Sequence, residues 1–148
     1  MKFSNFIIVS ILCLTFFSCK TYITTPQSFK EQFTGIDSTA LKARGMHSTF
    51  PYSYSGINLQ YKSNIIENIY VIDKNGEKVV LKNSPAIEMR ITLKNNKRYH
   101  FYFDTVVLQD DTLTGGRSRF MPDLVRKIPF ADITKIEVQD GGKQMRYN

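Results

Sequence analysis

Apolar and polar residues alternate through the second half of the chain, and the clearest alternation runs from Ile87 to Lys94. A period of two is typical of a strand that buries one face in an antiparallel sheet. Similar runs predict further strands over residues 57–62, 65–72, 79–81, 98–108, 112–120, 134–139 and 144–147. Short strands at this spacing indicate a mainly β fold, either an antiparallel small barrel or a sandwich.

Turn-forming residues separate these runs. Asn75 and Gly76 stand between two β-branched segments, and Asn-Gly is the strongest short-range signal for a β-hairpin. Residues 95–96, 110–111 and 140–142 mark further turns with Asn, Asp and Gly. Residues 128–133 predict a one-turn helical connector before the next strand.

The region before the first predicted strand is irregular in pattern. Residues 20–28 are mostly polar and predict a tether, within which Thr25 and Pro26 cap and open a short helix. That helix is expected to end at Gln32 or Phe33.

Residues 36–56 contain glycine, proline and several serines, and predict a loop with one helical turn near residues 40–43. We therefore expect one mainly β domain over residues 29–148. Its leading strands and hairpin occupy residues 57–85, and its barrel-like part occupies residues 86–148.

The N-terminus predicts export. Lys2 precedes a nearly continuous apolar run from Phe6 to Phe17, and a run of about 12 residues suits a signal peptide but is too short to span a bilayer. No Ala-x-Ala cleavage site follows; the run ends instead in Ser18 and Cys19. The alternatives are an uncleaved N-terminal anchor and a buried apolar helix.

The segment Phe16-Phe17-Ser18-Cys19 resembles the lipobox of bacterial membrane lipoproteins. The resemblance implies that residues 1–18 are a cleaved signal peptide and that the Cys19 thiol carries the lipid. The lipidated Cys19 and a tether would then occupy residues 19–28. Because Lys20 rather than an acidic residue follows the cysteine, the resemblance favours an outer-membrane anchor that faces the periplasm.

Signal removal would change the chemistry of the chain. The mature protein would have 130 residues, Cys13 would leave with the signal, and Cys19 would become a thioether. No free thiol would remain, which excludes thiol catalysis, cysteine–metal sites and disulfides.

Residues 86–148 show a second, weaker resemblance, to the SH3-like and Sm-like small β-barrels. The order of a hairpin, a long bent strand, another strand, the Ile-Pro-Phe-Ala-Asp-Ile turn and the Lys-Ile-Glu-Val strand carries it. The RNA-reading signatures of the Sm family are not visible, so its RNA function is not implied here.

Few residues suggest reaction chemistry. His100, Tyr102 and Asp104 have the spacing of one strand face, an arrangement that catalysis or metal binding could use but that more often forms a solvated or half-buried face. We predict no catalytic, cofactor-binding or metal-binding residues. The glycines of residues 114–119 accompany Arg117, Ser118 and Arg119, and these three are a candidate anion or partner contact, with a bent strand as the plainer interpretation.

Composition bounds the function further. The chain has 148 residues, with 42% hydrophobic and 22% charged, which suits one domain with a core. Its net charge of +7 becomes +6 without Lys2 and is spread evenly, so no nucleic-acid partner is expected. We predict membrane attachment through the N-terminal lipid and a non-catalytic interaction or scaffolding role with an envelope protein. The alternative is a binder or carrier of a small apolar ligand or anionic glycolipid, and a hydrolytic enzyme comes third.

Overall fold

The computed structural model describes residues 20–37, 40–48, 57–121, 123–143 and 145–148. The described part is mainly antiparallel β, which confirms the predicted fold class. The elements in chain order are β1 (Lys20–Thr24), α2 (Pro26–Phe33), β2 (Lys42–Ser48), β3 (Ile57–Ser63), β4 (Asn68–Ile72), β5 (Lys78–Lys82), β6 (Ile87–Leu93), β7 (Arg98–Tyr102), the 3₁₀ turn η2 (Phe103–Thr105), β8 (Val107–Gln109), β9 (Thr112–Gly116), β10 (Val125–Pro129), the 3₁₀ turn η3 (Phe130–Asp132), β11 (Ile133–Asp140) and β12 (Met145–Tyr147).

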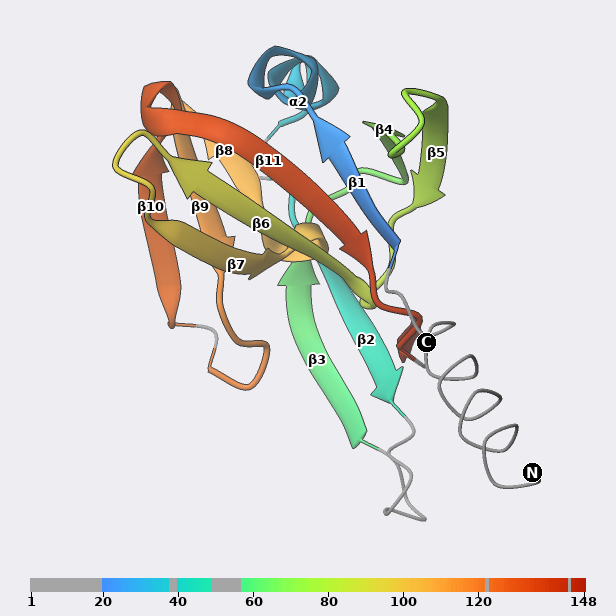
Figure 1. Cartoon of the computed structure of the whole chain (residues 1–148). Helices are drawn as coiled ribbons and strands as arrows, with labels where there is room; N and C mark the ends of the chain where they lie inside the picture. The colour runs from blue at the N-terminus through green and yellow to red at the C-terminus, as the bar shows by residue number, and fades with distance from the viewer. Residues whose placement is uncertain (1–19, 38–39, 49–56, 122, 144) are drawn as a thin grey trace, which may run out of the picture.

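The strands form three sheets (Figure 1). The largest has six strands in the order β5-β4-β1-β11-β6-β7, and we call it the main sheet. A second sheet has the order β10-β9-β8, and a third has the order β12-β2-β3. In Figure 1 the β2–β3 hairpin projects away from the main sheet on the side opposite α2. The described strands do not close into one barrel.

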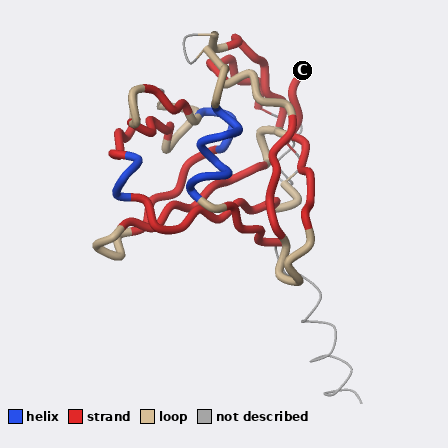
Figure 2. Tube along the Cα trace, turned by 90° about the horizontal axis from the view of Figure 1, so that it is seen from above, coloured by secondary structure: helices blue, strands red, loops and turns tan. Residues whose placement is uncertain are grey.

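Helix α2 covers the inner face of the main sheet. Thr25 caps it, since its Oγ1 accepts a hydrogen bond from the Ser28 backbone N–H at 3.1 Å. Phe29 and Phe33 are buried, and the Phe29 ring lies 6.2 Å from the rings of both Phe103 and Phe130. Viewed from above, strands surround the helix (Figure 2). The core therefore lies between α2, the main sheet and the second sheet.

Two segments predicted to lack strands contain them. The expected tether at residues 20–28 is wrong for Lys20–Thr24, because β1 pairs with β11 along all five residues. The expected loop at residues 36–56 is wrong for Lys42–Ser48, because β2 pairs with β3 over its whole length. The folded domain thus begins no later than Lys20, directly after the predicted lipid attachment residue Cys19, which lies outside the described residues.

The predicted long strands are broken. The strand expected over residues 98–108 stops at Tyr102, turns through η2 and resumes as β8. The strand expected over residues 112–120 ends at Gly116, and β10 was not predicted. By contrast, α2, the hairpin turn at Gly76, β6 and the connector at η3 agree with the sequence analysis. No helix in the described residues is long and apolar enough to cross a membrane.

Candidate functional site

A buried acid, Asp104, lies where the three sheets meet. It belongs to η2, and its side chain has no exposed surface. Asn64 fixes the backbone around it: the Asn64 side-chain amide donates to the carbonyl oxygens of Phe103 at 2.8 Å and Val106 at 3.0 Å. The Asn64 N–H also donates to the Asp104 carbonyl oxygen at 2.7 Å. The end of β3 thereby holds η2 in place.

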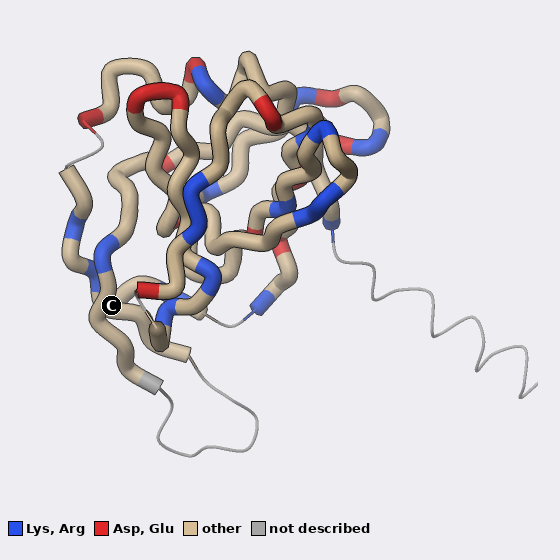
Figure 3. The backbone as a smooth tube through the Cα atoms, turned by 90° about the vertical axis from the view of Figure 1, so that its left-hand side faces the viewer, with Lys and Arg blue, Asp and Glu red and all other residues tan. Residues whose placement is uncertain are grey.

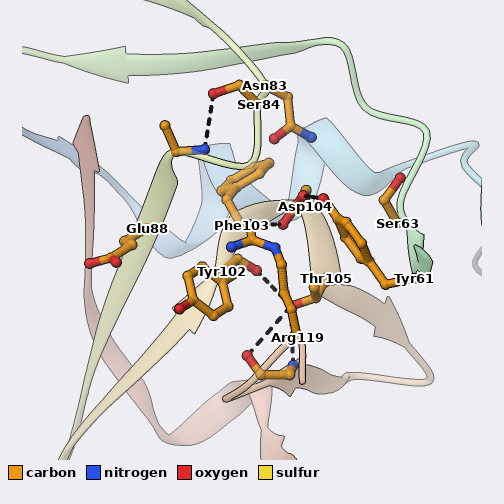
Figure 4. A network of polar contacts seen from close by, with 12 residues as sticks. Tyr61, Ser63, Asn83, Ser84, Glu88, Tyr102, Phe103, Asp104, Thr105 and Arg119 are labelled. Carbon is orange, nitrogen blue, oxygen red and sulfur yellow. Dashed lines mark hydrogen bonds and ion pairs between the residues drawn. The ribbon is translucent and has the colours of Figure 1, made fainter. Parts of the chain in front are cut away.

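Three side chains donate hydrogen bonds to the Asp104 carboxylate, and Figure 4 shows two of them, Tyr61 and Arg119, close to it. Arg119 Nη2 lies 2.8 Å from Oδ1, and the Arg119 side chain is only 3% exposed. Tyr61 and Tyr147 both donate their hydroxyl protons to Oδ2, the latter over 3.1 Å. We call these four residues the Asp104 cluster; it joins β3, η2, the segment after β9, and β12.

Aromatic rings enclose the cation of this cluster. The Arg119 guanidinium carbon lies 3.6 Å from the centre of the Tyr102 ring and 5.3 Å from that of Tyr61. Arg44 of β2 lies 4.3 Å above the Tyr147 ring. These contacts supply cation–π attraction in a desolvated setting. Within the described residues the Nε atoms of Arg44 and Arg119 are buried without a hydrogen-bond partner.

The environment keeps both cluster tyrosines protonated. Burial raises the pKa of Tyr61 above its ordinary value, and the negative charge of Asp104 and the hydrogen bond to it raise this pKa further. Burial and the same carboxylate raise the pKa of Tyr147. Both hydroxyls therefore stay hydrogen-bond donors.

This geometry suits a structural role better than a reaction. A general base must lie within reach of a substrate proton, whereas the Asp104 carboxylate has no exposed surface and already accepts three hydrogen bonds. Removing one partner of such a buried ion pair leaves an uncompensated charge in the interior. The cluster therefore holds together the segments that meet at the junction of the three sheets.

The residues singled out in the sequence reach different environments. His100 stays on β7 and is exposed, whereas Asp104 turns inward in η2, so the predicted strand face of His100, Tyr102 and Asp104 does not form. Arg119 is buried against Asp104, and Arg117 is exposed. Ser118 Oγ accepts hydrogen bonds from the backbone N–H groups of the two residues that follow Arg119.

The outer face of the main sheet is the second candidate site. Opposed residues of antiparallel strands share a face, so the strand register defines one row across the sheet. From β7 to β5 this row contains His100, Arg90, Glu137, Ile23, Ile72 and Lys78. It changes from polar and charged residues on β7, β6 and β11 to apolar residues on β1 and β4.

The apolar half of this face extends over β1, β4 and β5. Tyr70 pairs with Val80, and Ile72 pairs with Ile23. Tyr70 and Val80 are each 55% exposed, while Ile23 and Ile72 are 43% and 37% exposed. Neighbouring exposed apolar side chains of this kind mark contact surfaces in soluble domains. We call these four residues the apolar face.

A groove borders the apolar face beside the connection from β1 to α2. It has a volume of about 260 Å³ and is lined by Thr24, Thr25, Ser28, Tyr70, Val71, Ile72, Lys78, Val79 and Val80. Small-molecule pockets typically enclose about 300–1,000 Å³, so the groove is small for a carried ligand.

Ion pairs link the charged residues on the other half of this face. Glu137 on β11 accepts from Arg90 Nε at 2.7 Å and from Lys135 Nζ at 2.9 Å. The hydrogen bond from Arg90 lowers the pKa of Glu137 to about 2, against the opposing effect of burial. Figure 3 shows lysine and arginine distributed among acidic residues rather than gathered on one side.

No group of three or more His, Cys, Asp or Glu side chains able to hold a metal ion occurs among the described residues. Comparison of the chain with family models, curated proteins and solved structures finds no match.

Proposed function

We propose that this chain is a lipid-anchored, non-catalytic protein of the bacterial cell envelope that acts as an interaction or scaffolding module. The anchor is Cys19, and the anchored chain lies at the outer membrane on its periplasmic side. The Ser18-Cys19 motif after the apolar run supports the anchor. Because β1 begins at Lys20, an anchor at Cys19 would leave almost no linker between lipid and sheet.

The single observation that carries the interaction role is the apolar face. Its four side chains stay in contact with water although the main sheet has a well-filled interior on its other side. Exposing them has a solvation cost of about 25 cal/mol per Å², which a bound partner would relieve.

The charge around the apolar face specifies the partner. Lys78 and Lys82 are exposed on the same side of β5, and each lies two residues from Val80. The proposed partner is therefore another envelope protein that offers an apolar side chain to the groove and acidic side chains to the two lysines. Interfaces of this kind have an apolar centre and a charged rim.

Site-specific photo-crosslinking in cells tests this proposal. A photoreactive residue at Tyr70 or at Val80 should give the same discrete protein adduct in the membrane fraction. Ile72→Lys should remove that adduct, because it places a charge in the centre of the contact. Lys78→Glu should weaken it by reversing the charge at the rim.

Asn95, exposed in the turn between β6 and β7, provides the control position and should give no such adduct. Cys19→Ala should lose labelling by palmitate and also the adduct, since the chain would no longer be held beside its partner. Continued palmitate labelling of Cys19→Ala would refute the anchor. Identical adducts from Tyr70 and Asn95, or none from either of Tyr70 and Val80, would refute the interface.

A further inference from the structure

Strand β5 forms one end of the main sheet, and no other strand among the described residues lies beside its outer edge. Figure 1 shows β5 at the rim of the molecule, with β4 on its inner side. The open edge of a sheet presents unpaired backbone N–H and C=O groups, to which another extended segment can bind. The pairing of β5 with β4 defines which of its backbone groups face this edge.

Hydrogen-bonded and non-hydrogen-bonded pairs alternate along the β4–β5 ladder, as in any antiparallel pair. The Asn83 N–H donates to the Glu67 carbonyl oxygen at 2.9 Å, directly beyond the end of the ladder. Counting from this bond along the register places Val80 opposite Tyr70 in a non-hydrogen-bonded pair. The residues of β5 whose N–H and C=O groups point away from β4 are therefore Lys78, Val80 and Lys82.

Gln32 of α2 shows how the same backbone groups are satisfied on the other side of β4. The Tyr70 N–H donates to Gln32 Oε1 at 2.9 Å, and the Tyr70 carbonyl oxygen accepts from Gln32 Nε2 at 3.0 Å. The Gln32 side chain thus takes the place of a strand beside Tyr70. At Val80 no strand or side chain of the part of the chain that the structure describes takes this place. The edge of β5 therefore keeps backbone donors and acceptors available to a partner.

Both faces of β5 are apolar at this edge. Val79 and Leu81 are half-buried on the inner face and pack against the core. Val80 belongs to the apolar face on the outer side and is 55% exposed. An added strand would cover parts of all three side chains, so apolar burial and backbone hydrogen bonding would act together.

Two lysines select the sequence of the added strand. Lys78 and Lys82 flank Val80 on the outer face, and both are exposed. A second copy of this chain is disfavoured, because antiparallel pairing of two β5 strands about Val80 would set Lys78 opposite Lys82, and like charges directly opposite each other repel. Acidic side chains opposite the two lysines attract them instead. The segment that fits has three apolar residues between two acidic ones, an order that is the same in either chain direction.

We propose that β5 is a strand-addition site, at which an extended segment of a partner protein with this acidic and apolar order adds a seventh strand to the six-stranded main sheet. The central side chain of the segment packs beside Val80 and extends the apolar face, and its two acidic side chains contact Lys78 and Lys82. The inference rests on the proposed interaction role and adds to it the conformation and the sequence class of the partner segment.

A proline at Val80 tests strand addition in cells. Because the Val80 N–H points away from β4, Val80→Pro removes a donor from the open edge but no hydrogen bond of the sheet. Val80→Ala is the matched control, since it also shortens the side chain but keeps the N–H. With the photoreactive residue at Tyr70, Val80→Pro should lower the yield of the protein adduct about tenfold relative to Val80→Ala.

The same experiment separates strand addition from the interaction role. Equal adduct yields from Val80→Pro and Val80→Ala, with the adduct still removed by Ile72→Lys, would overturn strand addition and leave the interaction role standing. No adduct from Tyr70 in the otherwise wild-type chain would refute the proposed function, and strand addition is then decided by a peptide.

The peptide has the sequence Glu-Val-Ile-Val-Glu with serine on both sides and is added to the full chain in detergent. Amide hydrogen exchange, followed by nuclear magnetic resonance, should slow about tenfold or more at Lys78, Val80 and Lys82. Exchange at Val79 and Leu81 should not change, because their N–H groups already bond to β4. A peptide with lysine in place of both glutamates is the control and should slow none of these amides. Unchanged exchange at Val80, or equal slowing by the two peptides, would overturn strand addition.

Discussion

Asp104 and Glu137 are both buried acids in ion pairs, but the cations that pair with them differ in exposure. Asp104 is fully buried, and its partner Arg119 is 3% exposed. Glu137 lies on the outer face of the main sheet, where its partner Arg90 is 36% exposed. Asp104 accepts from one cation and two tyrosines, whereas Glu137 accepts from two cations that water also reaches.

The two ion pairs also differ in the segments that they connect. Arg90 and Glu137 lie opposite each other on neighbouring strands that backbone hydrogen bonds already join. Arg119 and Asp104 connect a loop to η2, and the tyrosines add β3 and β12, segments that share no continuous strand pairing with η2. A buried ion pair is costly to desolvate. Its contribution to the free energy of unfolding therefore depends on every hydrogen-bond donor to Asp104 remaining in place.

The largest expected effect comes from removing the cation of the buried pair. Arg119→Met would leave the Asp104 carboxylate charged in the interior with only tyrosine hydroxyls as donors. Loss of one partner of a buried pair costs about 3–5 kcal/mol, and we expect a loss of that size in the free energy of unfolding, measured by urea denaturation of the full chain in detergent.

The double variant Asp104→Asn with Arg119→Met is the control for this prediction. It removes both charges, so most of the lost stability should return. A cost below about 1 kcal/mol for Arg119→Met alone would contradict the assignment of Asp104 as a carboxylate that depends on this arginine. A double variant no more stable than Arg119→Met would show that the cost comes from lost packing.

The next effect is expected at alkaline pH. Burial and Asp104 raise the pKa values of Tyr61 and Tyr147 above the ordinary 10.0. Above pH 10 the unfolded chain releases these two protons and the folded chain keeps them, so stability falls as pH rises. The slope is at most about 1.4 kcal/mol per pH unit for each tyrosine. Denaturation followed by near-ultraviolet absorbance should detect two tyrosines that ionise only on unfolding.

Tyr61→Phe with Tyr147→Phe is the matched variant for the alkaline prediction. It lacks both hydroxyls and should be less stable at neutral pH, with a shallower decline above pH 10. If the folded wild type shows two more ionising phenols than this double variant just above pH 10, the two cluster hydroxyls do not have raised pKa values.

Local patterns predicted the parts of the fold that depend on local chemistry. Helix α2 follows from the Thr25 cap and Pro26, and β6 follows from strict alternation. Strand β1 was missed because Lys20, Thr21 and Thr24 make most of its short sequence polar, and it is a strand because β11 pairs with it. Pairing with a distant strand leaves no periodic signal in so short a segment.

The Asp104 cluster could not be predicted as a unit. The sequence pointed to Asp104 through its spacing from His100, and to Arg119 as an anion contact, but η2 turns Asp104 inward toward Arg119. Tyr61 and Tyr147 each lie 43 residues from Asp104 along the chain. No spacing rule connects such residues. The apolar face was equally hidden, since the exposure of Tyr70 depends on which face of the main sheet α2 covers.

The smallest effect is expected at Glu137. Its folded-state pKa of about 2 lies below its ordinary value of 4.5, so its ion pairs stabilise the chain fully above pH 4.5 and progressively less as pH falls toward 2. The shift from 4.5 to about 2 corresponds to at most about 3.4 kcal/mol. Because water screens Arg90 and Lys135, Glu137→Gln should cost less than this at neutral pH, about 1–2 kcal/mol. Urea denaturation between pH 2 and 7 should show a shallower acid decline for Glu137→Gln than for the wild type. Glu77→Gln, at an exposed turn, is the control and should leave the acid decline unchanged. A loss of stability in Glu137→Gln as large as that in Arg119→Met would remove the contrast between the Asp104–Arg119 pair and the Glu137–Arg90 pair.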